Sequence, residues 1–360
     1  MVTIDFAAGA DPESLAKAAR HAEYMRAARA NEMNMRDRRL TRLKAAEPGV
    51  REACKAYDAA VREPNRQALI EMVIRRPFIL CDPPRPPHVG DPEDDGPAPK
   101  EDLATRPAMT RLVHRRGAAP AFYLTALWDA QASTAPGELH KATRPLIDHA
   151  RGWDRLTGLR GFGLPTRDRQ LRLQRVLTQL ERNDLVRLPG RGVPGRYNDF
   201  KLLTDDRGDK RYRVPAHEPV IRLPAALITN GWHLVLEPTE IAFLLMLHAH
   251  AQILPTAHHG PDGVGIAPRM RWAVYGVTPE VYEVHNELWE FGLIDRVDSV
   301  RARKRGRVTP PAPGEDPLVT YGFKLKPDAF EQAAYDVVHT TLSREDGGRT
   351  ATWPRPITPT

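Results

Sequence analysis

The pattern of apolar and polar positions is clearest over residues 166–182, where apolar residues recur every three or four positions. The members of this apolar stripe are Leu173, Val176, Leu177 and Leu180. The spacing predicts an amphipathic helix with one buried face. Short aliphatic runs follow at 185–188 and 200–203, and Asp184 precedes the first of them. We expect a helix that turns tightly at Asp184 and leads into a two-stranded hairpin.

The same order of elements returns later in the chain. The expected second set is an apolar helix over 238–250, a short helix over 269–275, a helix over 279–291, and a hairpin of strands 293–297 and 319–326. The first set is expected to begin with an apolar helix over 121–128 and a second helix around 144–151. Thr166 and Thr278 are the expected capping residues of the helices that precede the two hairpins.

The N-terminal region is rich in Ala and Arg and carries apolar residues at helical spacing over 12–76, including Met72 and Val73. This composition predicts helical structure throughout the region. Pro48 and Pro64 are expected to divide it into at least three helices, because proline disrupts a helix interior.

Residues 77–107 differ in character, with nine prolines and seven acidic residues against three basic residues. They predict an extended, largely disordered linker that acts as a spacer, with competition against a nucleic acid for a basic surface as the alternative. The expected organisation is a helical N-terminal region at 1–76, a Pro-rich acidic linker at 77–117, a first domain at 118–215, a second at 216–342 and a flexible tail at 343–360.

Composition and charge narrow the classes of protein. The chain has 360 residues, 41% hydrophobic and 28% charged, with a net charge of +7 and a pI near 9.5, which favours a polyanionic partner. The two cysteines exclude a disulfide framework and fit a reducing cytoplasm. The first residues lack the features of a signal peptide, and the longest uncharged apolar stretch, 241–254, is too short to span a bilayer. We therefore expect a cytoplasmic protein without a membrane partner.

The two repeated sets resemble the winged-helix superfamily of bacterial transcription regulators, in which a Leu-Glu pair closes the recognition helix and a basic wing follows. The matching residues of the first set are Leu173, Leu177, Leu180, Glu181, Leu185 and Val186. Those of the second set are Val281, Val284, Leu288, Gly292, Leu293 and Ile294. The paired arrangement is also similar to plasmid replication initiators, and residues 221–232 strengthen that similarity. The resemblance covers 118–330 and departs from the pattern at Asp184 and His285.

The resemblance implies a mainly α protein with small β-hairpin wings, made of two winged helix-turn-helix domains after a helical N-terminal region. It implies binding to double-stranded DNA, in transcriptional regulation or in replication initiation of a bacterial plasmid or mobile element, and association with the nucleoid. The alternative is a non-catalytic winged-helix scaffold that mediates protein–protein contacts in a larger assembly.

The side of the 166–182 helix opposite the apolar stripe carries side chains that hydrogen-bond to bases and phosphates. The candidate DNA-binding residues of this helix are Arg167, Arg172, Gln174, Arg175, Thr178 and Arg182, and those of the following loop are Arg191 and Arg196. A charged face that is merely solvated is the alternative interpretation. The charge balance of this helix is +3, which favours a contact with DNA.

The 279–291 helix has the opposite charge, because it holds four glutamates and no Lys or Arg. Phosphates would repel Glu280, Glu283, Glu287 and Glu290, so these residues are expected to face a protein partner. The expected contact is with another protein, a second copy of the chain or another part of this chain. The N-terminal helices are the other candidate surface for a protein partner. The loop after this helix is nevertheless basic, and its candidate phosphate contacts are Arg301, Arg303, Lys304, Arg305 and Arg307.

Signals of catalysis or cofactor binding are weak. Residues 190–195 satisfy G-x-G-x-x-G, but Pro194 and a strand follow where a dinucleotide site requires a helix. His248 and His250 are two residues apart on an expected helix and point to different sides, so a metal site is not expected. The chain has no G-x-S-x-G motif and no Walker motif. We expect no enzymatic activity, no metal and no cofactor.

Overall fold

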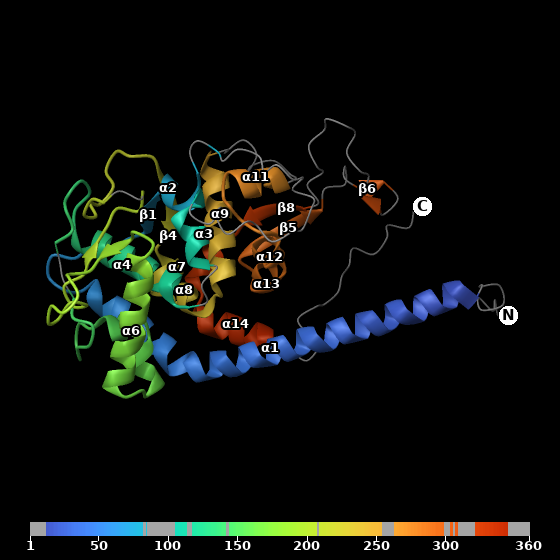
Figure 1. The fold of residues 1–360 in the computed structure, drawn as a ribbon, viewed down its shortest axis with the longest axis horizontal. Coiled ribbons are helices and arrows are strands. Elements are labelled where there is room, and N and C mark those ends of the chain that lie inside the picture. Colours follow the sequence, from blue (N-terminus) through green and yellow to red (C-terminus); the bar gives the residue numbers. More distant parts are fainter. Residues whose placement is uncertain are drawn as a thin grey trace. The chain divides into compact units, whose positions relative to one another are not determined.

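The computed structural model describes residues 12–81, 84, 105–113, 117–141, 144–206, 209–253, 263–298, 303–304, 307–308 and 321–344. The described chain is mainly helical and contains small antiparallel sheets of two strands each (Figure 1). This agrees with the predicted mainly α class with small β-hairpins. The chain divides into two compact units, one formed by Ala46–Val338 and the other by Met1–Ala45 together with His339–Thr360.

The N-terminal region differs from its prediction in two respects. Helix α1 (Pro12–Ala60) continues through Pro48 without a break, and Met72 and Val73 lie in strand β1 (Glu71–Arg75) instead of a helix. Strand β1 pairs antiparallel with β4 (Val220–Pro224). Met72 is buried completely on one face of β1 and Val73 is half-buried on the other. Burial of alternate residues against a partner distant in sequence therefore overrode the local helical pattern.

The proline-containing turn of α1 packs closely against the 158–162 segment. A Cβ atom at Gly49 would lie 2.2 Å from the carbonyl oxygen of Gly158, and one at Gly161 would lie 2.4 Å from that of Pro48. Two segments distant in sequence thus approach each other backbone to backbone, which only glycine allows. The contact involves η2 (Leu159–Phe162), and it holds the proline-containing turn of α1 in place.

In the smaller unit, the first part of α1 contacts the end of the last helix, α14 (Ala334–Leu342). The Arg36 guanidinium donates hydrogen bonds to the carbonyl oxygens of Leu342, at 3.2 Å, and of Thr341. Cations at a helix C-terminus stabilise the free carbonyl groups of the last turn.

Both ends of the predicted 77–117 linker are folded. Helix α2 (Arg76–Ile79) buries Phe78 and Ile79, and helix α3 (Ala108–Val113) buries most of its residues. The prediction of disorder over 77–107 was wrong at its start, and the linker bounds of 77–117 wrongly included α3, because the apolar side chains of both segments belong to the core. Residues 82–83 and 85–104 lie outside the described residues.

The first repeated set begins with α4 (Ala119–Ser133), which is buried along almost its whole length. The elements that follow are α5 (Trp153–Leu156), η2, α6 (Thr166–Glu181), β2 (Val186–Arg187) and β3 (Lys201–Leu202). Strands β2 and β3 pair antiparallel, as predicted, and Leu139, between α4 and α5, forms an isolated bridge with Arg213. Asp184 has a φ of 59° and so adopts the left-handed turn conformation that was predicted.

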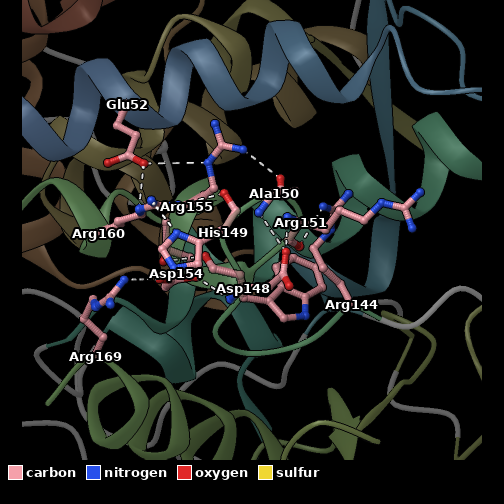
Figure 2. A network of polar contacts seen from close by, with 12 residues as sticks. Glu52, Arg144, Asp148, His149, Ala150, Arg151, Asp154, Arg155, Arg160 and Arg169 are labelled. Carbon is pink, nitrogen blue, oxygen red and sulfur yellow. Dashed lines mark hydrogen bonds and ion pairs between the residues drawn. The ribbon is translucent and has the colours of Figure 1, made fainter. Parts of the chain in front are cut away.

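Two local predictions in this set were wrong. Residues 144–151 form turns, because the Asp148 carboxylate accepts the backbone N–H groups of Ala150 and Arg151 at 2.8 and 2.7 Å (Figure 2). Such side-chain bonds compete with helical hydrogen bonding. Thr166 is the first residue of α6 and not its cap, since Pro165 occupies the cap position and no side chain caps the helix.

The second repeated set follows a short connection of α7 (Ala226–Thr229) and α8 (Trp232–Val235). Its elements are α9 (Pro238–Ile253), α11 (Pro268–Ala273), α12 (Pro279–Glu283), α13 (His285–Glu290), β5 (Ile294–Asp298), β6 (Arg303–Lys304), β7 (Arg307–Val308) and β8 (Tyr321–Leu325). Strands β5 and β8 pair antiparallel, as predicted, and Val264, between α9 and α11, bridges Phe323 of β8. The 3₁₀ helix η4 (Pro327–Glu331) then leads to α14.

The predicted 279–291 helix is divided at Val284 into α12 and α13. The His285 ring nitrogen lies 2.8 Å from the carbonyl oxygen of Tyr282, a local bond of the kind that competes with the helix. The predicted cap Thr278 occupies the cap position of α12 without a side-chain hydrogen bond. His285 is buried and packs against the rings of Phe243 and Phe323.

A buried polar cluster connects four helices of the larger unit. The His233 ring nitrogen Nε2 lies 3.0 Å from both the Tyr57 hydroxyl and the Thr125 hydroxyl. Tyr57 also donates to the carbonyl oxygen of Leu156. Burial lowers the pKa of His233 from 6.5 to about 3. The imidazole is therefore neutral in the folded protein at pH 7.

Among the described residues, none of the helices combines the length and the apolar character that crossing a bilayer requires.

The buried face of α6 gives a test of the fold. Leu177 is fully buried, whereas Leu171 on the same helix is 41% exposed. We expect Leu177→Ala to lower the free energy of unfolding by about 2–5 kcal/mol. Leu171→Ala should change it by less than about 0.5 kcal/mol. Urea unfolding followed by circular dichroism measures both, and similar losses in the two variants would contradict the orientation of α6.

The low pKa of His233 predicts acid sensitivity. Its unfolded pKa is 6.5 and its folded pKa about 3, so between these pH values the unfolded chain binds a proton that the folded protein does not. Stability is therefore lost as pH falls from 6.5 towards 3, by about 1.4 kcal/mol per pH unit from this group. His233→Gln should reduce the slope of unfolding free energy against pH over this window. An unchanged slope would show that His233 is not buried as a neutral group.

Candidate nucleic-acid interface

Helix α6 is fixed in the fold by its apolar side and by an ion pair near its start. Leu173, Leu177 and Leu180 are buried, and α6 packs against α4 and α5. The Arg169 guanidinium donates to the carboxylate of Asp154, which is almost completely buried. Burial raises the pKa of Asp154, and the nearby Arg169 opposes this shift. Arg169 therefore has a structural partner, which separates it from the other arginines of α6.

The turn region beside α5 is held by a polar network of basic side chains (Figure 2). Arg155 donates to the carbonyl oxygen of Ala150, and Arg160 to that of His149, each at 2.7 Å. Glu52 of α1 lies 3.6 and 3.4 Å from the Nε atoms of these two arginines. The network attaches the turn region and α5 to α1, and α5 in turn packs against α6.

The outer side of α6 carries the predicted residues. Arg167, Arg172, Arg175 and Arg182 are exposed, and Gln174 and Thr178 are half-buried. In the following loop, Arg191 is exposed and Arg196 is half-buried. The structure thus places every predicted residue of the first set on the accessible surface of the larger unit.

Two adjoining hollows lie on this side of α6, and they share Gln174 and Tyr197. The first is about 390 Å³ and is lined by Leu171, Gln174, Arg175, Thr178, Gln179, Arg182 and Tyr197. The second is about 440 Å³ and is lined mainly by residues of the 190–198 loop together with Gln170 and Gln174. Within the described part of the chain, no acidic residue lines either hollow. Arg167 and Arg172 do not line them and lie outside this pair of hollows.

An ion pair fastens the loop to the helix. Nη2 of Arg196 lies 2.8 Å from Oε2 of Glu181, and the backbone N–H of Leu188 donates to Oε1 of Glu181 at 3.3 Å. The Tyr197 hydroxyl lies 3.4 Å from that of Thr178. The charge of Arg196 is therefore balanced in part within the protein, and its main role is to position the loop.

Sequence reasoning missed Tyr197, although this residue is common to both hollows. Its ring also lies 5.6 Å from the Arg196 guanidinium. An aromatic residue beside an arginine in a Gly-rich loop was a signal that could have identified it, since aromatic rings stack on bases. Gln170 and Gln179 were also missed, because amide side chains on a helix surface are common.

The second set presents a different surface. Glu280 and Glu283 are exposed, and Glu287 and Glu290 are half-buried. Two arginines near them lie over aromatic rings. Arg271 is 3.5 Å from the centre of the Tyr282 ring, and Arg296 is 4.5 Å from that of Trp289. These contacts occupy the faces of two aromatic side chains of α12 and α13.

The basic loop of the second set is described only in part. Arg303–Lys304 and Arg307–Val308 form the paired strands β6 and β7. Arg301 and Arg305 lie outside the described residues. The role of this loop as a set of phosphate contacts stays a prediction.

The weak catalytic signals have structural explanations. Residues 190–195 form turns, with positive φ at Gly192 and Gly195, and no helix follows them before β3. His248 and His250 are buried, and the Nδ1 atom of His250 lies 2.9 Å from the Tyr275 hydroxyl. The described residues contain no group of three or more His, Cys, Asp or Glu side chains suited to hold a metal.

Comparisons of this chain with protein-family models, with curated protein sequences and with solved structures found no match.

The Glu181–Arg196 pair gives a test of how the loop is held. We expect Glu181→Ala to accelerate amide hydrogen exchange over residues 188–198, because the Leu188 N–H and the Arg196 side chain are both deprived of an acceptor. The loss of overall stability should stay within about 1 kcal/mol, as is usual for ion pairs near the surface. Asp168→Ala, which removes an exposed carboxylate from the same helix, is the control. Equal exchange in the two variants would contradict the proposed fastening.

Proposed function

We propose that the protein binds double-stranded DNA with sequence preference, through α6 and the 190–198 loop. The observation that carries the proposal is the accessible side of α6, where arginine, glutamine and threonine side chains line hollows that contain no acidic residue. Arginine hydrogen-bonds to guanine O6 and N7, and glutamine to adenine, so this set of side chains suits a major groove. The buried leucines on the other side of α6 keep it rigid, which base recognition requires.

The order of elements supports a winged-helix arrangement for this region. In both sets a long apolar helix is followed by a bridging residue, a short helix, a further helical segment and two paired strands. In winged-helix proteins the helix before the paired strands is the one that enters the groove. That position corresponds to α6 in the first set.

The two sets are proposed to have different roles. The α6 segment 166–182 has a charge balance of +3, whereas residues 279–291 have a balance of −4. Glu280 and Glu283 are exposed on the second set, and phosphates would repel them. We assign α12 and α13 to a contact with protein, either a second copy of the chain or another protein. The basic loop that follows them remains the proposed contact to the DNA backbone.

The biological role proposed is transcriptional regulation or replication initiation on a bacterial plasmid or other mobile element, which rests on the resemblance in sequence pattern. A winged-helix scaffold without DNA contact is the competing possibility. Covering of Arg167, Arg175, Arg191 and Arg196 by another part of the chain would favour the scaffold. Among the described residues the first three are exposed and Arg196 is half-buried.

Substitution of the reading residues tests this proposal. We expect Arg167→Ala and Arg175→Ala each to weaken binding to a specific site by about 1–3 kcal/mol where the arginine hydrogen-bonds to a base. The sites would first be selected from a random duplex library with the unaltered protein. Fluorescence anisotropy at fixed salt measures the affinity, because phosphate contacts make it depend strongly on salt.

Arg222→Ala is a matched control, since this exposed arginine lies on β4 and pairs with Glu71. It should leave the affinity nearly unchanged. An affinity equal to that of the parent in both α6 variants would refute the assignment of α6 as the reading helix. Failure to select any site would favour the scaffold.

A further inference from the structure

A narrow crevice lies next to the second hollow, and Asn198 lines both of them. Its apolar walls come from Ala126, Trp153, Phe200 and Leu202. The Trp153 and Phe200 rings are 5.7 Å apart, so these walls are firmly packed. The enclosed part is about 20 Å³, which is room for one or two water-sized groups.

The polar lining of the crevice is cationic. Lys141, Arg144, Lys201 and Arg211 line it together with His140, and none of the described lining residues is acidic. Burial lowers the pKa of His140, which leaves this ring neutral at pH 7. Four positive side chains from three separate segments therefore converge on a small space with apolar walls. Such walls strengthen the attraction for an anion, because the local dielectric constant is low.

Arg144 lies at the buried side of this crevice. Its guanidinium donates to the Asp129 carboxylate at 2.7 Å and to the carbonyl oxygen of Arg151 at 2.8 Å. Asp129 also accepts from Arg66, so one buried carboxylate serves two arginines. Glu63 is 3.9 Å from Arg66 and does not line the crevice. The charge of Arg144 is thus only partly balanced, and the pair with Asp129 holds it in a fixed position.

Two buried donors beside the crevice have no hydrogen-bond partner among the residues that the structure describes. The Nε atom of Arg144 and the indole Nε1 atom of Trp153 make no hydrogen bond, although the two residues are only 8% and 4% exposed. An unsatisfied buried donor is costly. Both residues line the crevice, so an acceptor seated in it would lie close to these groups.

We propose that this crevice binds a phosphate group. A phosphate offers several oxygens and up to two negative charges to donors that converge from different directions, whereas a carboxylate offers one charge and two coplanar oxygens. The enclosed space admits one or two phosphate oxygens, and the exposed Lys141 and Arg211 lie at its mouth to contact the others. The phosphate belongs either to the backbone of a duplex or to a free phosphate or phosphate ester.

The site does not depend on the proposed role of α6, because it can be tested with inorganic phosphate alone. We expect the midpoint of thermal unfolding of the full chain to rise by about 2–4 °C at phosphate concentrations tenfold above the dissociation constant. The comparison is sodium chloride at equal ionic strength. Acetate at equal ionic strength should produce no rise, because it lacks the charge and the oxygens that the site is proposed to use.

The double variant Lys141→Gln/Arg211→Gln should abolish most of this rise. Both side chains are exposed, so the variant is expected to fold, and its midpoint in sodium chloride checks this. Arg222→Gln, which removes an exposed cation elsewhere, should retain the full rise. No rise in the parent protein, or an equal rise in the double variant, would overturn the proposal.

The source of the phosphate is decided with duplex DNA. If the site holds a backbone phosphate, the double variant should reduce the slope of log affinity against log salt by about 0.9 for each phosphate that it no longer neutralises. If the slope is unchanged while the response to inorganic phosphate disappears, the ligand is a free phosphate or phosphate ester. If the parent binds no DNA but responds to phosphate, the phosphate site stands and the function proposed for α6 falls.

Discussion

The packing of the apolar face of α6 against α4 and α5 is the interaction on which the candidate interface depends. Leu173, Leu177 and Leu180 lie on one side of the helix, and their burial fixes its rotation about its own axis. Once that rotation is set, the arginines at the other positions must face outwards. The surface that we propose for DNA is therefore a consequence of burying three leucines, which provide the main stabilisation.

Two ion pairs further fix the positions of α6 and of the loop that follows it. Arg169 pairs with buried Asp154 near the start of α6, and Arg196 pairs with Glu181 near its end. These two cations hold the helix and the loop in position and contribute less to attracting a polyanion. Among the described residues, no carboxylate pairs with Arg167, Arg172 or Arg175, and Arg175 lines a hollow that has no acidic residue in its described lining. Arginines in the same region thus differ in role, because only some of them lie beside a carboxylate in the folded chain.

The sequence was sufficient to predict elements whose pattern is local and strong. The helix over 166–182, both hairpins and the left-handed turn at Asp184 appear in the structure close to the predicted residues. Predictions failed where distant residues decide the outcome. Strand β1 exists because its partner β4 follows about 150 residues later, and the turn of α1 that contains Pro48 packs against glycines near residue 160. No local pattern carries that information.

In the candidate nucleic-acid interface, too, local patterns were predictable and contacts between distant residues were not. Amphipathic spacing identified which side of α6 is accessible, including Arg175, Gln174 and Thr178. It left Arg169 out of the candidate residues but could not identify its partner, since the carboxylate of Asp154 comes near only in the folded chain. Tyr197 and the cationic crevice beside α5 arise from loops that meet in space, and their role in binding requires the three-dimensional arrangement.

The most direct test of the account is photo-crosslinking of the full chain to duplex DNA. A photoreactive amino acid is placed at Gln174, which lines both hollows, or at Glu283, which is exposed on α12. The account predicts covalent attachment of DNA from position 174 and little or none from position 283. Attachment from position 283 without attachment from position 174 would contradict it.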